Sequence, residues 1–167
     1  MGRRVQILVV GYNQEICTPE ALRIAYEVGR AVARRGCILV TGGLGGVMEA
    51  ASRGALEEGG MTVSIIPQKM LNVANPYSTV VVATGLGHMR NFVNVYSADG
   101  VIVVGGGAGT LSEVSEAYIE GKPIVCIEGS GGIADNLPEF LDERRTVRIM
   151  RARAPDEAVS LILDMLK

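Results

Sequence analysis

Short runs of β-branched residues alternate along this chain with longer stretches of helical spacing. Runs such as Val5–Val10 and Val101–Val104 have the continuous apolar character of strands that are covered on both faces. The stretches between them repeat apolar residues every three or four positions, as helices do when one face packs on a sheet. The predicted strands are Val5–Val10, Cys37–Thr41, Thr62–Ile66, Ser78–Ala83, Val101–Val104, Pro123–Ile127 and, as an edge strand, Thr146–Met150.

The predicted helices begin and end at local signals. Thr18-Pro19-Glu20 supplies a capping residue, a proline and an acid for a helix that runs to about Arg35 and ends at Gly36. Further helices are predicted over Val47–Glu58, His88–Ala98, Thr110–Tyr118, weakly around Leu137–Asp142, and from Pro155 to the C-terminal end. Strands that alternate with helices predict right-handed βαβ units. We therefore expect an α/β fold, a Rossmann-like three-layer doubly wound parallel sheet, in a single domain over residues 1–167.

Composition agrees with a compact domain and argues against some partners. The 167 residues are 48% hydrophobic and include 22 glycines, a composition that argues against disorder. The formal net charge of −2 gives no basic field for a nucleic acid, and the arginines between Arg144 and Arg153 are interpreted as a solvated face. No apolar run approaches the ~20 residues that a membrane span needs.

The cysteines and the single histidine do not form a reactive or metal-binding pattern. Cys17, Cys37 and Cys126 have neither metal-ligand nor redox-pair spacing, so we interpret them as reduced thiols of a cytoplasmic protein. His88 has no partners for a catalytic triad. Neither a metal site nor a resident cofactor is expected.

Two glycine-rich turns follow predicted strands at the edge of the sheet where ligands of such folds bind. A shift of 64 positions places Gly36–Ala50 on Gly100–Val114 and matches Glu49 with Glu113. Any tight strand-to-helix turn favours glycine, but two such turns, each followed by a glutamate, favour a nucleotide or phosphoester pocket. The candidate phosphate-binding residues are Gly42, Gly43, Gly45, Gly46, Gly106, Gly107, Gly109 and Thr110.

Several common nucleotide and cofactor motifs are absent from the sequence. Neither turn continues into Gly-Lys-Ser/Thr, which disfavours magnesium-dependent triphosphate hydrolysis. The first strand ends in the single glycine Gly11, and no acid follows Val40-Thr41 to bind a ribose, so a dinucleotide fingerprint is unconvincing. Pyridoxal phosphate would need a Schiff-base lysine, and the lysines present are poorly placed for one: Lys69, Lys122 and Lys167.

The glycine motifs resemble those of the LONELY GUY (LOG) superfamily, which was long labelled as lysine decarboxylases. Gly106–Glu113, GGAGTLSE, matches the signature GGxGTxxE, and Arg90 aligns with the arginine of the preceding signature segment. The resemblance covers essentially the whole domain. Gly105 stands where the signature has proline and Asn91 where it has lysine. The segment Thr84–Asn91 looks closer to a branch that includes the molybdenum cofactor carrier proteins.

The resemblance implies hydrolysis of the N-glycosidic bond of a nucleoside 5′-monophosphate. Glu113 would stabilise the oxocarbenium-like sugar or activate water, and Arg90 would fix the phosphate or assist the departing base. Structural roles stay open for both: Glu113 as an acid that complements the helix dipole, Arg90 as part of a solvated face. Gly11, Met89 and Asn91 are further candidate ligand contacts.

The departures from the signature leave a second function open. The protein would then be a carrier or sensor that binds a nucleotide- or pterin-type ligand, such as molybdenum cofactor, without turning it over. The resemblance also implies a homodimer or homotetramer. The helix His88–Ala98, with Met89, Phe92, Val93 and Tyr96, is a candidate contact face for it, or else it packs on the sheet.

Overall fold

The structure, a computed structural model, describes residues 2–167. It is a parallel sheet of seven strands in the order β4-β3-β2-β1-β5-β6-β7. The strands are β1 (Gln6–Gly11), β2 (Ile38–Thr41), β3 (Met61–Ile66), β4 (Val80–Ala83), β5 (Gly100–Val104), β6 (Ile124–Ile127) and β7 (Ile149–Ala152). The helices are α1 (Pro19–Arg34), α2 (Val47–Glu57), α3 (Arg90–Tyr96), α4 (Ala108–Ile119), α5 (Gly132–Asn136) and α6 (Pro155–Met165), with short 3-10 turns η1 (Leu71–Val73) and η2 (Gly87–Met89). The predicted Rossmann-like α/β fold is confirmed.

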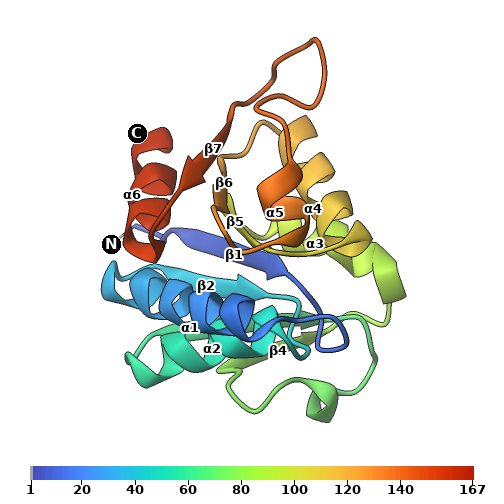
Figure 1. The fold of residues 1–167 in the computed structure, drawn as a ribbon. Coiled ribbons are helices and arrows are strands. Elements are labelled where there is room, and N and C mark those ends of the chain that lie inside the picture. The colour runs from blue at the N-terminus through green and yellow to red at the C-terminus, as the bar shows by residue number, and fades with distance from the viewer. Residues whose placement is uncertain (1) are drawn as a thin grey trace.

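Helices cover both faces of the sheet, which gives the molecule three layers (Figure 1). Alternate side chains of β1 divide between the two cores: Ile7 and Val9 pack with α1, α2 and α6. Leu8 and Val10 pack with residues of α3, α4 and α5 on the other face. Since β1 is buried on both faces, its unbroken apolar run is the pattern that a central parallel strand requires.

The order of the strands reverses beside β1. From β1 the chain builds outward through β2, β3 and β4, and then returns to place β5 on the other side of β1. Ligands of doubly wound sheets bind at the carboxyl ends of the strands at such a reversal. The turns that follow β2 and β5 both lie at this place.

Helices α1 and α2 pack against each other through two glycines. A Cβ on Gly29 would lie 1.9 Å from the Ala51 carbonyl oxygen, and one on Gly54 would lie 2.0 Å from that of Tyr26. The two backbones therefore touch at the middle of the helices. The predicted cap of α1 is confirmed, since the Ala21 N–H donates to Thr18 Oγ1 over 3.1 Å.

The prediction of a helix around Leu137–Asp142 is wrong. The helix in this region is α5, which begins five residues earlier and ends at Asn136. Its N–H groups at Ile133 and Ala134 donate to the Gly106 and Gly105 carbonyls, at 3.0 and 3.1 Å. Leu137 is extended, as a residue before proline prefers to be, so the helix stops there.

Other boundaries also differ from the predictions: β4 begins at Val80 and α4 at Ala108, each two residues from the expected start. The edge strand β7 begins at Ile149, three residues later than expected, where its register with β6 pairs Ile149 with Ile124. The expected helix over His88–Ala98 is divided into η2 and α3, so that Arg90 is the first residue of the α-helix.

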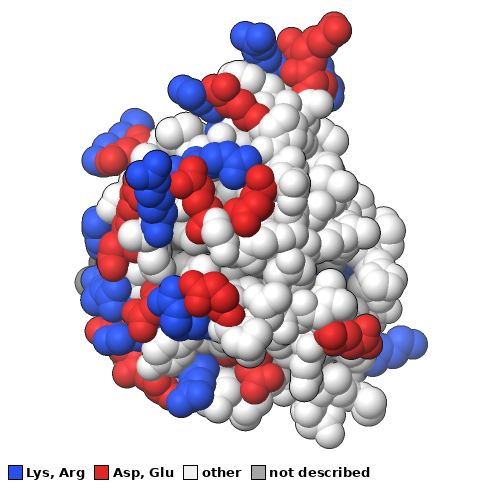
Figure 2. All heavy atoms as spheres, viewed as in Figure 1, with Lys and Arg blue, Asp and Glu red and all other residues white. Residues whose placement is uncertain are grey.

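Charged side chains gather over the side of the molecule formed by α1 and α6, whereas the face over α3 and α4 is mostly uncharged (Figure 2). The arginines near the C-terminal end are engaged locally: Arg144 with Asp142, Arg148 with Glu139, Arg153 with Glu128, and Arg151 with the carbonyls of Ala134 and Leu137. In the part of the chain that the structure describes, no helix combines the length and apolar character needed to cross a membrane.

Candidate functional site

The turn after β5 begins with a segment that the protein itself holds in place. Gly105 and Gly106 have φ angles of +61° and +97°, a region that favours glycine. The Gly105 N–H donates to Ser130 Oγ over 2.9 Å, and the α5 amides bind both carbonyls. The ring of Tyr12 covers Gly105, since a Cβ there would lie 2.2 Å from a ring carbon. This first half of the turn is therefore a fixed, internal structure.

The second half of the same turn is open. Gly107 precedes α4 without a side-chain cap, and Ala108 and Gly109 are exposed. A Cβ on Gly109 would meet no atom within 4 Å, and one on Gly107 would meet only Ile16, at 3.7 Å. The N–H groups in the first turn of a helix lack intrahelical partners, and the exposure of this turn leaves room for an anion to approach it.

Thr110 is placed differently from the glycines before it. Its side chain is buried, and its hydroxyl donates to the Gly11 carbonyl over 3.0 Å. Gly11 itself lies against β5, where a Cβ would come within 2.0 Å of the Val104 carbonyl oxygen. The Thr110 hydroxyl proton therefore ties α4 to β1, and Gly11 allows β1 to lie close to β5. Backbone amides are the donors that this turn has left.

The turn after β2 has its space filled by side chains of the protein. A Cβ on Gly42 would lie 1.9 Å from Arg90 Nη1, and one on Gly45 would lie 2.5 Å from the side-chain oxygen of Gln14. Gly43 and Gly46 have positive φ angles of +74° and +71°. A Cβ on Gly43 would reach Ser64 and Ile66, and one on Gly46 would lie 2.5 Å from the Tyr12 carbonyl oxygen. Packing and backbone geometry within the protein therefore account for all four candidate glycines of this turn.

Arg90 and Glu113 come together beneath these turns, with Asn94 beside them. Arg90 begins α3, Asn94 lies four residues later on the same face, and Glu113 belongs to α4. Arg90 and Glu113 are each 8% exposed and Asn94 is 0% exposed. Asn94 Nδ2 donates to Glu113 Oε1 over 2.7 Å. A buried arginine, amide and carboxyl are thus concentrated at the reversal point of the sheet.

Burial dominates the electrostatics of this group. It raises the pKa of Glu113 to about 7, while the Asn94 hydrogen bond and the charge of Arg90 act in the opposite direction. Burial likewise lowers the pKa of Arg90, and the charge of Glu113 opposes that change. Among the described residues, neither Arg90 Nε nor Asn94 Oδ1 has a hydrogen-bond partner. The group has unused hydrogen-bonding capacity.

The remaining candidate contacts flank this group. Met89 is 63% exposed immediately before Arg90. Asn91 donates to Ser112 Oγ over 3.0 Å, and Ser112 donates to the Gly109 carbonyl over 2.6 Å, so Asn91 ties α3 to the first turn of α4. Sequence reasoning missed Asn94 and Tyr12. Asn94 had a signal, because it lies four residues after Arg90 on a helix whose inward positions are otherwise apolar.

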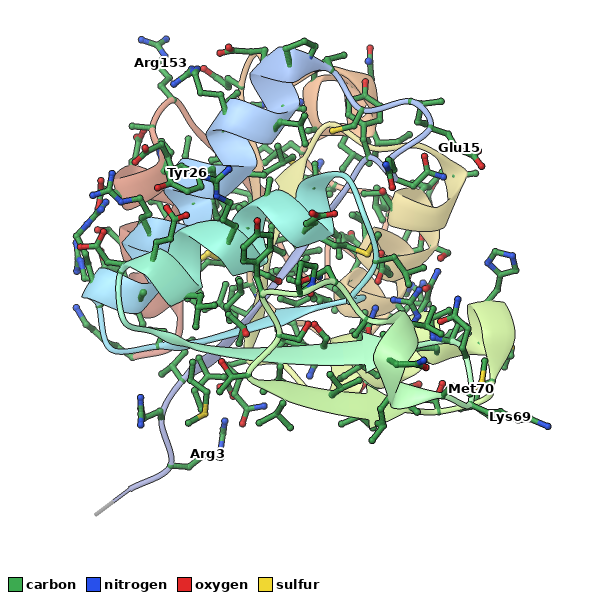
Figure 3. The ribbon with its side chains drawn as sticks, turned by 90° about the horizontal axis from the view of Figure 1, so that it is seen from below. Arg3, Glu15, Tyr26, Lys69, Met70 and Arg153 are labelled. Carbon is green, nitrogen blue, oxygen red and sulfur yellow. The ribbon has the colours of Figure 1, made fainter. Side chains whose placement is uncertain are left out.

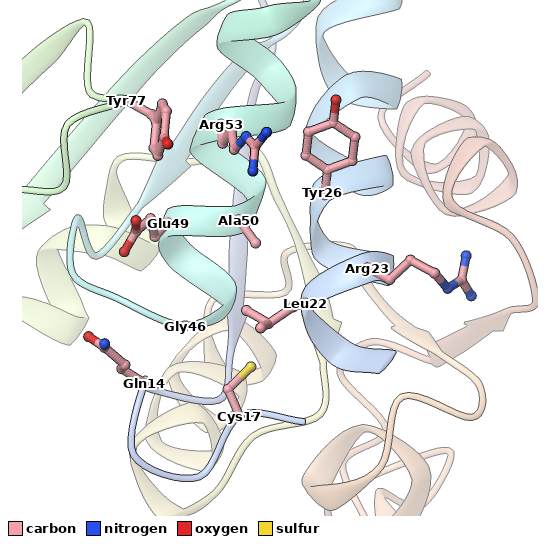
Figure 4. A pocket seen from close by; sticks show the side chains of 10 residues that line it. All are labelled: Gln14, Cys17, Leu22, Arg23, Tyr26, Gly46, Glu49, Ala50, Arg53 and Tyr77. Atoms are coloured by element: carbon pink, nitrogen blue, oxygen red, sulfur yellow. The ribbon is translucent and has the colours of Figure 1, made fainter. Parts of the chain in front are cut away.

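A separate groove of about 440 Å³ lies between the N-terminal halves of α1 and α2 (Figure 4). Its lining includes Gly46, Glu49 and Ala50 from the second helix region and Cys17, Leu22 and Tyr26 from the first. Figure 3 also shows Tyr26, on the side of the molecule that α1 and α2 form. Arg90 and Glu113 do not line this groove, so the two sites share only the neighbourhood of the first glycine turn.

Comparison with known proteins places this arrangement in a family. The family model described as the SLOG cluster4 family matches residues 4–159. The chain belongs to the SLOG cluster4 family. The LOG-like resemblance inferred from the glycine motifs is thereby confirmed.

Three relatives of this SLOG cluster4 chain carry informative names. A cytokinin riboside 5′-monophosphate phosphoribohydrolase of Mycobacterium tuberculosis is 36% identical over 122 residues, which cover 67% of this chain and 65% of that protein. The structure of a molybdenum cofactor binding protein from Rippkaea orientalis matches with a TM-score of 0.87 and 34% identity, covering 99% of both chains. The molybdenum cofactor carrier protein of Chlamydomonas reinhardtii matches with a TM-score of 0.83 and 30% identity, over 98% of this chain and 99% of that one.

In the SLOG cluster4 chain, the site contains no cluster of metal-ligand type. Within residues 2–167, no three His, Cys, Asp or Glu side chains lie close enough together to hold a metal ion. Lys122 donates its Nζ hydrogens to the carbonyls of Val95 and Ala98 at the C-terminal end of α3, at 2.8 and 2.6 Å. The groups that the described site brings together are backbone amides, the Arg90 guanidinium, the Asn94 amide and the Glu113 carboxyl.

Proposed function

We propose that this protein binds a phosphorylated, nucleotide-like small molecule at the carboxyl ends of β1, β2 and β5. The phosphate would lie on the N–H groups at Gly107–Gly109, where α4 begins. The observation that carries the proposal is Gly109, which is exposed and helical and at which an added Cβ would meet no atom within 4 Å. Glycine destabilises a helix relative to alanine, so a glycine that the protein's own packing does not require is best explained by a ligand that approaches the backbone.

The reaction that these residues support best is cleavage of an N-glycosidic bond in a nucleoside 5′-monophosphate. That reaction passes through an oxocarbenium-like sugar, which a carboxylate beside the anomeric carbon stabilises. A Glu113 carboxyl with a pKa of about 7 is present in both protonation states at neutral pH, as a group that donates and accepts protons must be. Arg90 would bind the phosphate or assist the departing base. The named phosphoribohydrolase relative supports this proposal.

A second candidate is a non-catalytic carrier or sensor of a nucleotide- or pterin-type ligand such as molybdenum cofactor. The observation that favours it is Gly105, whose φ of +61° is closed to the proline of the hydrolase signature, because proline fixes φ near −65°. The turn thus opens with a backbone geometry unlike the one that the signature implies. The molybdenum cofactor binding and carrier proteins match over nearly the whole chain, which also favours this candidate.

A panel of nucleoside 5′-monophosphates separates the two candidates. Release of free base from the purified protein, measured by chromatography, is expected if it is a hydrolase. Glu113→Gln should then abolish turnover and leave the affinity for the phosphorylated ligand within about tenfold, because the amide keeps the shape of the side chain and loses its charge and proton. Binding in a thermal-shift screen without base release would eliminate the hydrolase. A Glu113→Gln variant that loses binding alone would contradict the role assigned to this carboxyl.

We also propose that the protein self-associates as a homodimer or homotetramer in the cytoplasm. On the predicted contact face, Met89 and Tyr96 are 63% and 57% exposed, while Phe92 and Val93 are half-buried. Other exposed apolar residues are Leu86, just before this face in the chain, and Met70, which points outward beside Lys69 from the loop after β3 (Figure 3). The three cysteines are free thiols, as a reducing compartment permits. Sedimentation of the parent chain and of Met89→Glu tests the assembly.

A further inference from the structure

Asn94 is a buried polar side chain of which only one end is hydrogen-bonded, which is rare in protein interiors. It is 0% exposed in the middle of α3. One end of its amide, Nδ2, donates to Glu113 Oε1 over 2.7 Å, while among the described residues its other end, Oδ1, has no partner. A buried acceptor without a partner is destabilising, so the unused oxygen calls for an explanation.

The surroundings of Glu113 identify what Asn94 contributes. From α3, the charge of Arg90 acts on the Glu113 carboxyl. On α4 itself, the next acid, Glu116, accepts from the Tyr96 hydroxyl over 2.5 Å. On α5, Asp135 accepts from the N–H groups of Gly129 and Gly131, both at 2.8 Å. Asn94 is therefore the neutral group that is hydrogen-bonded to the carboxyl, and Arg90 is the cation whose charge acts on its pKa.

An asparagine amide can serve either form of a neighbouring carboxyl. Its NH₂ group donates to a carboxylate, and its oxygen accepts from the O–H of a carboxylic acid. Half a turn about the last side-chain bond exchanges these two groups without moving the helix. A leucine of similar size could do neither, and an ionised aspartate could only accept.

We propose that Asn94 is a positioning residue for Glu113, one that keeps the Glu113 carboxyl hydrogen-bonded as carboxylate and as carboxylic acid by turning its amide over. The inference rests on the role proposed for Glu113, and it names the device by which that residue changes protonation state inside a closed site. In the charged form Nδ2 donates, as the structure has it. In the neutral form Oδ1, now unused, accepts the acid proton. The unpartnered Oδ1 is thus the group that binds Glu113 once the carboxyl is protonated.

The parent protein alone provides the first test. NMR of ligand-free protein with labelled side-chain amides and carboxyls should show the Asn94 amide and the Glu113 carboxyl titrating with a common midpoint, with Glu113→Gln used to assign the signals. In Glu113→Gln the Asn94 amide should no longer respond to pH. An Asn94 amide that is insensitive to pH while Glu113 titrates would overturn the proposal. Since no ligand or turnover is involved, this result is independent of whether the protein is a hydrolase.

Variants supply the second test. Asn94→Leu removes the donor to the carboxylate and should raise the pKa of Glu113 by about 1, and Asn94→Ser should bring it part of the way back. Asn91→Ala, on the same helix but bonded to Ser112, is the matched control and should leave that pKa unchanged. A folded Asn94→Leu protein with the parent's midpoint would contradict the inference. If Asn94→Leu does not fold, the serine variant and the parent titration still decide. If base release is found, Asn94→Leu should also shift the pH profile of kcat, which a merely structural role would not do.

Discussion

The two glycine turns have similar sequences, but the first is packed against other parts of the protein whereas the second is partly open. In the turn after β2, the positions that a side chain would take are filled by Arg90, Gln14 and the residues of β3. In the turn after β5, Gly105 and Gly106 are enclosed in the same way, but Gly107 and Gly109 face open space. A glycine motif therefore marks a close approach to the backbone without saying whether the approaching group is protein or ligand.

The two glutamates that the sequence alignment matches, Glu49 and Glu113, also differ: Glu49 lies in the first turn of α2, whereas Glu113 is the sixth residue of α4. Glu49 is half-exposed and lines the groove between α1 and α2. Glu113 is buried against Asn94 and near Arg90. The repeated sequence pattern thus gives one buried carboxyl and one surface carboxyl, and the difference arises from α3, which covers only the second.

The largest effect is expected from restoring the signature proline in the second turn. Gly105→Pro would force the backbone away from a φ of +61°, remove the N–H that donates to Ser130 and place the ring on Tyr12. We expect the unfolding free energy to fall by more than about 3 kcal/mol. Urea denaturation measures this. A stable Gly105→Pro protein would mean that this half of the turn is not fixed as described.

Filling the first turn should have the next largest effect. Gly46→Ala combines a φ of +71° with a contact of 2.5 Å to the Tyr12 carbonyl oxygen, and should lower the unfolding free energy by about 3 kcal/mol. Gly59→Ala is the matched control, since its φ of +77° is similar and no atom lies within 4 Å. It should lose only about 1–2 kcal/mol. Equal losses in the two variants would show that the first turn is not packed against the Tyr12 loop.

The pH dependence of stability should report the buried carboxyl. The pKa of Glu113 is about 7 in the folded protein against 4.5 as the ordinary value, so the folded state holds this proton more tightly. Its contribution to stability is present below pH 4.5 and is lost as the pH rises to 7. The unfolding free energy of the parent relative to Glu113→Gln should fall by up to about 3 kcal/mol across that range. Glu49→Gln is the matched control for the surface carboxyl, and a flat difference for Glu113→Gln would contradict its burial.

The smallest effect on stability, and the sharpest on binding, is expected at Gly109. Gly109→Ala meets no atom of the protein and should raise the unfolding free energy by up to about 1 kcal/mol, because alanine favours a helix. It should weaken binding of a nucleoside monophosphate or of inorganic phosphate at least tenfold, as measured by calorimetry. Ser115→Ala, farther along α4, is the control for an alanine on this helix. Unchanged binding in Gly109→Ala would remove the phosphate from this turn.

Much of the fold could be predicted from the sequence because its signals are local. The central strands are unbroken apolar runs, and Thr18-Pro19 marks the start of α1 by capping alone. The helix α5 could not be placed in this way. Its position depends on hydrogen bonds to the carbonyls of Gly105 and Gly106. Ile133 and its partner Gly106 are 27 residues apart in the chain. The one local signal was Pro138, which keeps Leu137 extended and ends the helix.

The candidate site could be predicted in part for a similar reason. Arg90 and Glu113 belong to recognisable motifs, and the structure brings them close together. Asn94 belongs to no motif, and its importance follows from a contact across two helices. The unequal filling of the two glycine turns is likewise a property of tertiary packing, since the side chains that fill the first turn come from distant parts of the chain.

The contact of Arg90 with Gly42 has a consequence for how the sequence can change. Arg90 Nη1 lies where any side chain at position 42 would begin, at 1.9 Å from its Cβ. The residue at position 42 and the Arg90 side chain therefore compete for the same space, although 48 positions separate them. A larger residue at position 42 is therefore expected to push the Arg90 guanidinium out of its present place in the site, even where Arg90 itself is kept.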